Sequence, residues 1–153
     1  MLQNYTTLID AAMVKMGLNP DETRGEEQGQ WQIFRGTIGI FIDVWKPNQN
    51  SDWNYTGTEN AIETFQVIAP ITELPDSSKL LQFYEELLHM NFHLYKASLI
   101  INRKDNVLAI KYKSIADSLT EAEVIEAIES TGYYAEMLSE YYSKNYGVKK
   151  LSE

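Results

Sequence analysis

The sequence predicts an α+β domain in which an antiparallel β-sheet carries its helices on one face, in the order α-β-β-β-α-β-β-α. Apolar residues recur at helical spacing in three segments, near both ends and in the middle of the chain. Strand-like apolar runs are grouped as three and then two, and short turn sequences join the first two and the last two. Strands that follow one another through short turns favour antiparallel pairing.

The first helix is predicted over residues 5–16. Gly17 supplies a left-handed cap, and Leu18 is the apolar residue that commonly packs back on the last turn. Residues 19–29 are polar, contain Pro20 and two glycines, and are typical of a connector. The residues that form the apolar stripe of this helix are Tyr5, Leu8, Ile9, Ala12, Met13 and Met16.

Residues 31–34 and 37–45 predict two strands that Arg35 and Gly36 join by a tight turn. The second strand is apolar on both faces, so both faces need cover. Helices can cover one face, and residues 47–60 or a second protein molecule can cover the other. The side chains on one face are Ile38, Ile40, Ile42 and Val44, and those on the other are Phe41 and Trp45. A third strand is expected over residues 61–69, ended by Pro70 and Pro75.

A central helix follows, with Asp76 or Ser77 as its N-cap and Asn91 as a left-handed last residue. Its apolar stripe is expected to face the sheet. Residues 97–101 and 107–112 flank a polar stretch and predict a hairpin. The stripe of the central helix consists of Leu80, Leu81, Tyr84, Leu87 and Leu88.

The last helix opens at Thr120-Glu121-Ala122-Glu123, a capping box. Gly132 is a point at which this helix can bend, and the residues from Gly147 onward are expected to fray. We therefore expect one domain over residues 1–146 and a C-terminal tail over residues 147–153. The apolar side of the helix carries Val124, Ile125, Ile128, Ala135, Leu138, Tyr141 and Tyr142.

Composition narrows the functional classes. With 153 residues, 44% of them hydrophobic, the chain is long enough to bury a core without disulfides, and it contains no cysteine. A net charge of -9 disfavours nucleic acid and anionic membranes as partners. No stretch has the length of a membrane span, and the N-terminus does not resemble a secretory signal, so the cytoplasm is the expected location.

No motif predicts catalysis, a metal or a cofactor. Glu86 and His89 have the spacing of bundle metal sites, with His93 four residues further on, but two histidines are too few for such a site. Pairs such as Glu85 and Glu86 are adjacent rather than convergent, and no nucleophile or phosphate-binding motif occurs. An enzyme of unknown reaction stays the least favoured class.

The aromatic residues suggest binding. Trp31, Phe34, Phe41 and Trp45 are predicted to form a partner-binding surface, with core packing as the alternative. In a second hypothesis, Trp53 and Tyr55 belong to a loop that closes over a small ligand. The tyrosines of the last helix can likewise belong either to the core or to a binding surface. These tyrosines are Tyr133, Tyr134, Tyr141, Tyr142 and Tyr146.

The leucine-rich helix that ends in Leu87-Leu88-His89-Met90-Asn91-Phe92, the hairpin of residues 98–110 and Leu119-Thr120 before the last helix resemble the type III secretion chaperone-like fold. This fold is shared by effector chaperones typified by the Tir chaperone and by YbjN-type domains, described as sensory transduction regulators. The resemblance implies a bacterial cytoplasmic protein that forms a homodimer, needs no cofactor, binds a segment of another polypeptide and catalyses nothing.

Overall fold

The computed structural model describes residues 2–45 and 63–152. Five strands form one sheet in the order β1-β2-β3-β5-β4, and every neighbouring pair is antiparallel. The α+β class and its antiparallel sheet are thus confirmed. The elements are α1 (Leu2–Lys15), α2 (Pro20–Thr23), β1 (Gln30–Arg35), β2 (Ile38–Trp45), β3 (Thr64–Glu73), α3 (Leu80–Asn91), β4 (Ala97–Asn102), β5 (Val107–Ile115), the short 3-10 turn η1 (Ala116–Ser118) and α4 (Glu121–Tyr146).

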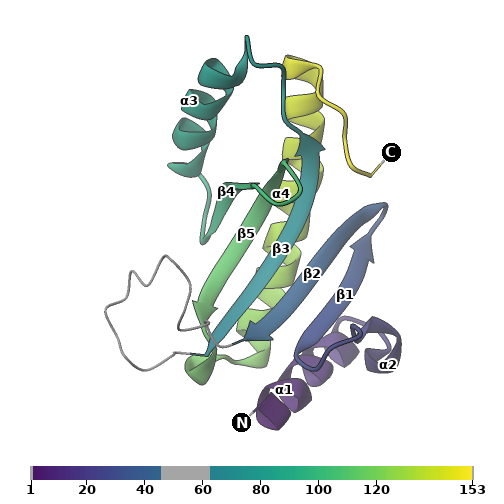
Figure 1. Cartoon of the computed structure of the whole chain (residues 1–153). Helices are drawn as coiled ribbons and strands as arrows, with labels where there is room; N and C mark the ends of the chain where they lie inside the picture. Colours follow the sequence, from purple (N-terminus) through teal and green to yellow (C-terminus); the bar gives the residue numbers. More distant parts are fainter. Residues whose placement is uncertain (1, 46–62, 153) are drawn as a thin grey trace.

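The helices lie on one side of the sheet. In Figure 1, α4 runs behind the strands, α1 packs near its first turns, and α3 stands beside β4 at the other end. The core between α4 and the sheet contains Ile40, Ile42, Val67, Ile110 and Leu138, all at most 2% exposed. Along β2, buried residues alternate with more accessible ones, as expected for a strand covered on one face.

The end of α1 has the predicted cap. Gly17 adopts a left-handed φ of 79°, and its N–H donates to the carbonyl of Val14 at 3.0 Å. The N–H of Leu18 donates to the carbonyl of Met13 at 2.9 Å. These two bonds satisfy carbonyls that the helix leaves open at its end.

The connector that follows contains a helix that the sequence analysis missed. Pro20 opens α2, and the side chain of Asn19 accepts a hydrogen bond from the N–H of Asp21 at 3.1 Å. Both are ordinary start signals, but α2 spans only four residues and leaves no periodic pattern.

β3 is longer than predicted. Pro70 lies inside the strand instead of ending it, and pairing with β5 continues to Glu73. The register shifts between Pro70 and Thr72, and such an irregularity is where a strand tolerates proline. The predicted start of this strand, residues 61–62, and the loop of residues 47–60 lie outside the described residues.

The ends of α3 also differ from the predictions. Lys79 is the N-cap and makes no side-chain cap, whereas the carbonyl of Asp76 accepts a bond from the N–H of Lys79 at 2.9 Å. Asn91 is not left-handed, since among the described residues only Lys96 and Asn106 combine a side chain with a positive φ. The hairpin of β4 and β5 is confirmed, and Asn106 lies in its turn; Asn102, expected in the loop, pairs with Val107, and β5 runs on to Ile115.

The capping box of α4 is confirmed, because Thr120 and Glu123 bond each other in both directions. Gly147 ends the helix with a φ of 65°. Gly132 has a packing role: a Cβ atom there would lie 2.8 Å from Cδ of Arg35 and 3.0 Å from Cδ1 of Ile40. The glycine therefore permits close approach of α4 to the β1–β2 hairpin.

The tail differs from the expected frayed end. Val148 is 6% exposed, and the residues after it return along β3, where the N–H of Glu73 donates to the carbonyl of Lys149 at 2.9 Å (Figure 1). The expectation failed because the tail pairs with a strand far away in the sequence, which local composition does not reveal.

Candidate protein-binding surfaces

The sheet face opposite α4 is the first candidate surface, and we call it the open face. Phe34 on β1 is 66% exposed and Phe41 on β2 is 37% exposed, whereas Trp45 is half-buried. The register places Phe41 next to Gln32 on one side and Ile68 on the other. The open face thus presents aromatic and aliphatic side chains between polar ones.

Trp31 borders the groove described below, but its side chain is buried and is not presented on the open face, so this part of the predicted surface is corrected. Trp31 is 2% exposed and points into the core with Ile33, because odd residues of β1 face the helices. Its indole N–H donates to a carboxylate oxygen of Asp10 at 3.1 Å, and Arg24 binds the other oxygen of the same group. Trp31 therefore ties β1 to α1.

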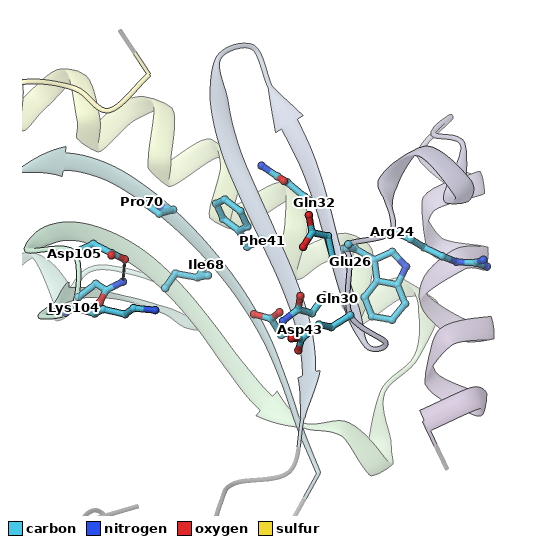
Figure 2. Close-up of a pocket in the computed structure, with 14 residues that line it drawn as sticks. Arg24, Glu26, Gln30, Gln32, Phe41, Asp43, Ile68, Pro70, Lys104 and Asp105 are labelled. Atoms are coloured by element: carbon cyan, nitrogen blue, oxygen red, sulfur yellow. Dashed lines mark hydrogen bonds between the residues drawn. The ribbon is translucent and has the colours of Figure 1, made fainter.

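A groove of about 780 Å³ crosses the open face. Figure 2 shows Phe41, Ile68 and Pro70 on neighbouring strands of this groove, with Asp43 further along β2 and Glu26 in the loop before β1. At its far end the groove is bounded by Lys104 and Asp105 of the β4–β5 turn (Figure 2). The site therefore combines an apolar floor with charged walls.

Carboxylates predominate on the β1 and β2 side of the open face, and two lysines lie on β5. Asp43 accepts a hydrogen bond from Nε2 of Gln66 at 3.1 Å, and Glu26 and Glu27 line the same side of the groove. On β5, Lys111 lies beside Ile68, and burial together with the nearby charge of Lys113 lowers its pKa. Lys113 places its ammonium 5.6 Å from the ring centre of Trp45.

The outer side of α3 is the second candidate surface. Leu81 is 74% exposed, Leu88 is 73% exposed and Phe92 is 86% exposed, with Tyr84 between them. These four residues, which we call the α3 stripe, recur at helical spacing. The prediction that this stripe is buried was wrong for Leu81, Tyr84 and Leu88. The buried residues of α3 are Phe83 and Leu87.

An aromatic cluster decides this orientation. Phe83 is fully buried, with its ring centre 5.4 Å from that of Tyr142 and 5.0 Å from that of Tyr146 on α4. The carboxylate of Glu86 accepts hydrogen bonds from the hydroxyls of Tyr141 and Tyr146. Burial and then the bond to Glu86 raise the pKa of Tyr146 to about 12.

The tyrosines of α4 thus divide between packing and the surface. Tyr142 and Tyr146 are buried, whereas Tyr133 is 55% exposed. Tyr134 is half-buried, and its hydroxyl accepts a bond from the N–H of Tyr95 at 3.0 Å. The sequence signal for the buried pair was present, since Tyr142 and Tyr146 stand one helical turn apart and on the side of Leu138.

The edge of β4 beside α3 is capped at Leu99. Asn91 bonds the backbone of Leu99, so a further strand meets a side chain there instead of free backbone groups. His89 and His93 are exposed at the same end of α3, with ring centres 5.0 Å apart. Within residues 2–45 and 63–152, no three potential ligands gather around a metal position.

The predicted ligand loop with Trp53 and Tyr55 lies outside the described residues. In the part of the chain that the structure describes, no helix is both long and apolar enough to span a membrane.

Comparisons with known proteins identify the fold. No family model and no curated protein matches the chain. A chain of the HopA1–SchA chaperone–effector complex superposes with a TM-score of 0.61 at 12% identity, covering 89% of this chain and 93% of that one. A chain of the ExsC–ExsE complex superposes with a TM-score of 0.57 at 13% identity, covering 95% and 96%. The chain thus has the secretion chaperone-like fold that its sequence predicted.

Proposed function

We propose that this chain is a non-catalytic, chaperone-like module of the cytoplasm that captures a segment of another polypeptide on the open face. The observation that carries the proposal is the exposure of Phe34 and Phe41, diagonal neighbours whose rings both approach Gly39, on a sheet face that no described helix covers (Figure 1). Aromatic residues of this kind are enriched where proteins bind each other. The likeness to two chains found in complexes, one of them described as chaperone–effector, supports this choice. A YbjN-type regulator would hold its partner on the same surface.

The charges of the groove indicate the chemistry of the bound segment. The chain carries a net charge of -9, and Glu26, Glu27 and Asp43 line the side of the groove nearest β1. A segment with basic residues over these carboxylates and apolar residues over Phe41 and Ile68 would be complementary to both. Trp45 extends the same surface beside Lys113.

A photo-crosslinking experiment tests this proposal. A benzophenone-bearing phenylalanine analogue replaces Phe34, and in a control it replaces Val14, which is 61% exposed on α1. After irradiation in cells of the natural host, we expect a defined polypeptide adduct from position 34 and none from position 14. Phe41→Asp, added to the first variant, is expected to weaken the adduct. No adduct at position 34, or the same adducts at both positions, would overturn the proposal.

We further propose that a second copy of this chain covers the α3 stripe. Leu81, Leu88 and Phe92 form a row of exposed apolar side chains. Single exposed apolar residues are common on protein surfaces, but a contiguous row of them marks an interaction surface. A two-fold axis across the row would bring the same residues of both copies together. The cap that Asn91 places on the backbone of Leu99, in the middle of β4, favours contact through the helix over a sheet that continues from one copy to the next.

Light scattering coupled to size exclusion checks this dimer. The unaltered chain is expected at twice the mass of one chain, and Leu88→Glu is expected at the mass of one chain because it places charge in an apolar contact. Val14→Glu, at another exposed apolar position on α1, is the matched control and should keep the dimer. A single-chain mass for the unaltered protein would contradict the dimer.

A further inference from the structure

The edge of β3 beyond Ile68 is covered by the chain's own C-terminal tail. β2 pairs with β3 only from Thr64 to Ile68, so the last residues of β3 extend past β2. Residues 148–151, which we call the tail strand, occupy the vacant position. The N–H of Leu151 donates to the carbonyl of Ile71 at 2.9 Å, as the N–H of Glu73 does to Lys149. These bonds flank an antiparallel bridge between Thr72 and Lys150.

The tail strand shows which side chains this edge accepts. Val148 is 6% exposed and joins the core, whereas Leu151 is 39% exposed. Nζ of Lys150 lies 3.0 Å from the carboxylate of Glu140 on α4. The edge therefore holds an extended segment of the pattern apolar, basic, basic, apolar.

The tail strand also borders the open face. Leu151 and Ser152 line a hollow of about 280 Å³ together with Phe34, Phe41 and Pro70. A polypeptide that lies over Phe34 and Phe41 would reach the backbone of residues 71–73 if it continued across this hollow towards Leu151. The tail strand would then compete with it for the same edge.

The attachment of the tail strand is light compared with the rest of the sheet. Two backbone hydrogen bonds join residues 149 and 151 to β3, Lys150 pairs with the largely exposed Glu140, and of residues 148–151 only Val148 is buried. β3 is paired with β5 along nearly its whole length on the other side. Segments with few buried contacts open more easily than core strands do.

We propose that the tail strand is a displaceable plug. An extended segment of the partner polypeptide, with apolar residues in the places of Val148 and Leu151 and a basic residue in the place of Lys150, pairs with residues 71–73 in its stead. This inference rests on the proposed capture of a polypeptide and adds a backbone edge and its regulation. Strand addition supplies main-chain hydrogen bonds of any sequence, and the side-chain positions supply selectivity.

A labelled peptide of residues 147–152 tests the edge without any client. The full-length variant Val148→Asp/Leu151→Pro unseats the tail strand, since it buries a charge and removes the N–H that bonds Ile71. Ser152→Pro keeps both backbone bonds and is the matched control. By fluorescence anisotropy, we expect the peptide to bind the double variant at least about tenfold more tightly than the unaltered chain, where the tail occupies the edge. A peptide N-methylated at Leu151 should lose this binding.

Equal binding of the peptide to the double variant and to the unaltered chain, or no binding to a folded double variant, would overturn the proposal that the tail strand is displaceable. Peptide binding without a crosslink at Phe34 would instead overturn the proposed function and leave the edge standing. Hydrogen exchange on the unaltered chain provides a second measurement if the double variant does not fold. The amides of Glu73 and Leu151 should exchange at least about tenfold faster than the β3–β5 ladder, whereas equal protection would mean that the tail opens only by global unfolding.

Discussion

The side-chain amide of Asn91 pairs with both backbone polar groups of Leu99. The N–H of Leu99 donates to Oδ1 of Asn91 at 2.6 Å, and Nδ2 of Asn91 donates to the carbonyl of Leu99 at 3.2 Å. Because β4 is the outermost strand on this side, Asn91 fills hydrogen-bonding positions that a neighbouring strand would use. The last residue of α3 thus caps the sheet edge at Leu99.

Asn91→Ala is expected to lower the free energy of unfolding by about 1–3 kcal/mol, because two half-buried backbone groups lose their partners. The variant should also self-associate more than the unaltered chain does, because the backbone groups of Leu99 are then free to pair with another strand. Urea unfolding and light scattering measure the two effects. Asn145→Ala, which removes one bond from an exposed side chain of α4, is the control and should change stability by less than about 0.5 kcal/mol. Similar losses in both variants would count against the closing role.

Phe83→Ala is expected to destabilise the protein by about 3–5 kcal/mol, since it leaves a cavity between Tyr142 and Tyr146. Phe34→Ala makes the same chemical change on the open face and should cost less than about 1 kcal/mol. Chemical denaturation distinguishes the two. If Phe34→Ala proved the costlier substitution, the orientation of α3 described above would be wrong.

Stability should fall at high pH through the tyrosine cluster. The pKa of Tyr146 is raised to about 12 in the folded chain from an ordinary value near 10, so the neutral phenol is favoured by folding. Its contribution is complete below about pH 10 and is lost as the pH rises towards 12. Tyr146→Phe should flatten this decline, measured as unfolding free energy against pH. Tyr133→Phe, a change at an exposed ring, should leave the decline in place.

Gly132→Ala is expected to destabilise the chain by about 1–2 kcal/mol, because crowding of the new methyl group outweighs the gain in helix propensity. The neighbours that it would meet are Cδ of Arg35 and Cδ1 of the buried Ile40. In an Arg35→Ala background the same substitution should cost less, which a double-mutant cycle on unfolding free energies detects. An unchanged cost would assign the conflict to Ile40 alone.

Much of the fold could be predicted because its signals are local. The cap at Gly17, the capping box at Thr120 and the strand periods near Ile40 depend on residues within a few positions of each other. Part of the open face could also be predicted from the sequence, since the alternation of residues along β2 separates Phe41 from its buried neighbours. Trp31 was misplaced because it was grouped with the aromatics by type and not by its odd position in β1.

The sequence by itself determined the order of the main elements, the cap of α1 at Gly17 and the capping box of α4 at Thr120. Only the tertiary structure decided which side of α3 is buried, because its apolar residues form two stripes at helical spacing, one with Leu81 and Leu88 and the other with Phe83 and Leu87. The pocket between Tyr142 and Tyr146, formed by a distant helix, selects Phe83. The same holds for the tail strand, whose bonds to Ile71 and Glu73 exist only once β3 extends past β2 and leaves backbone groups unpaired.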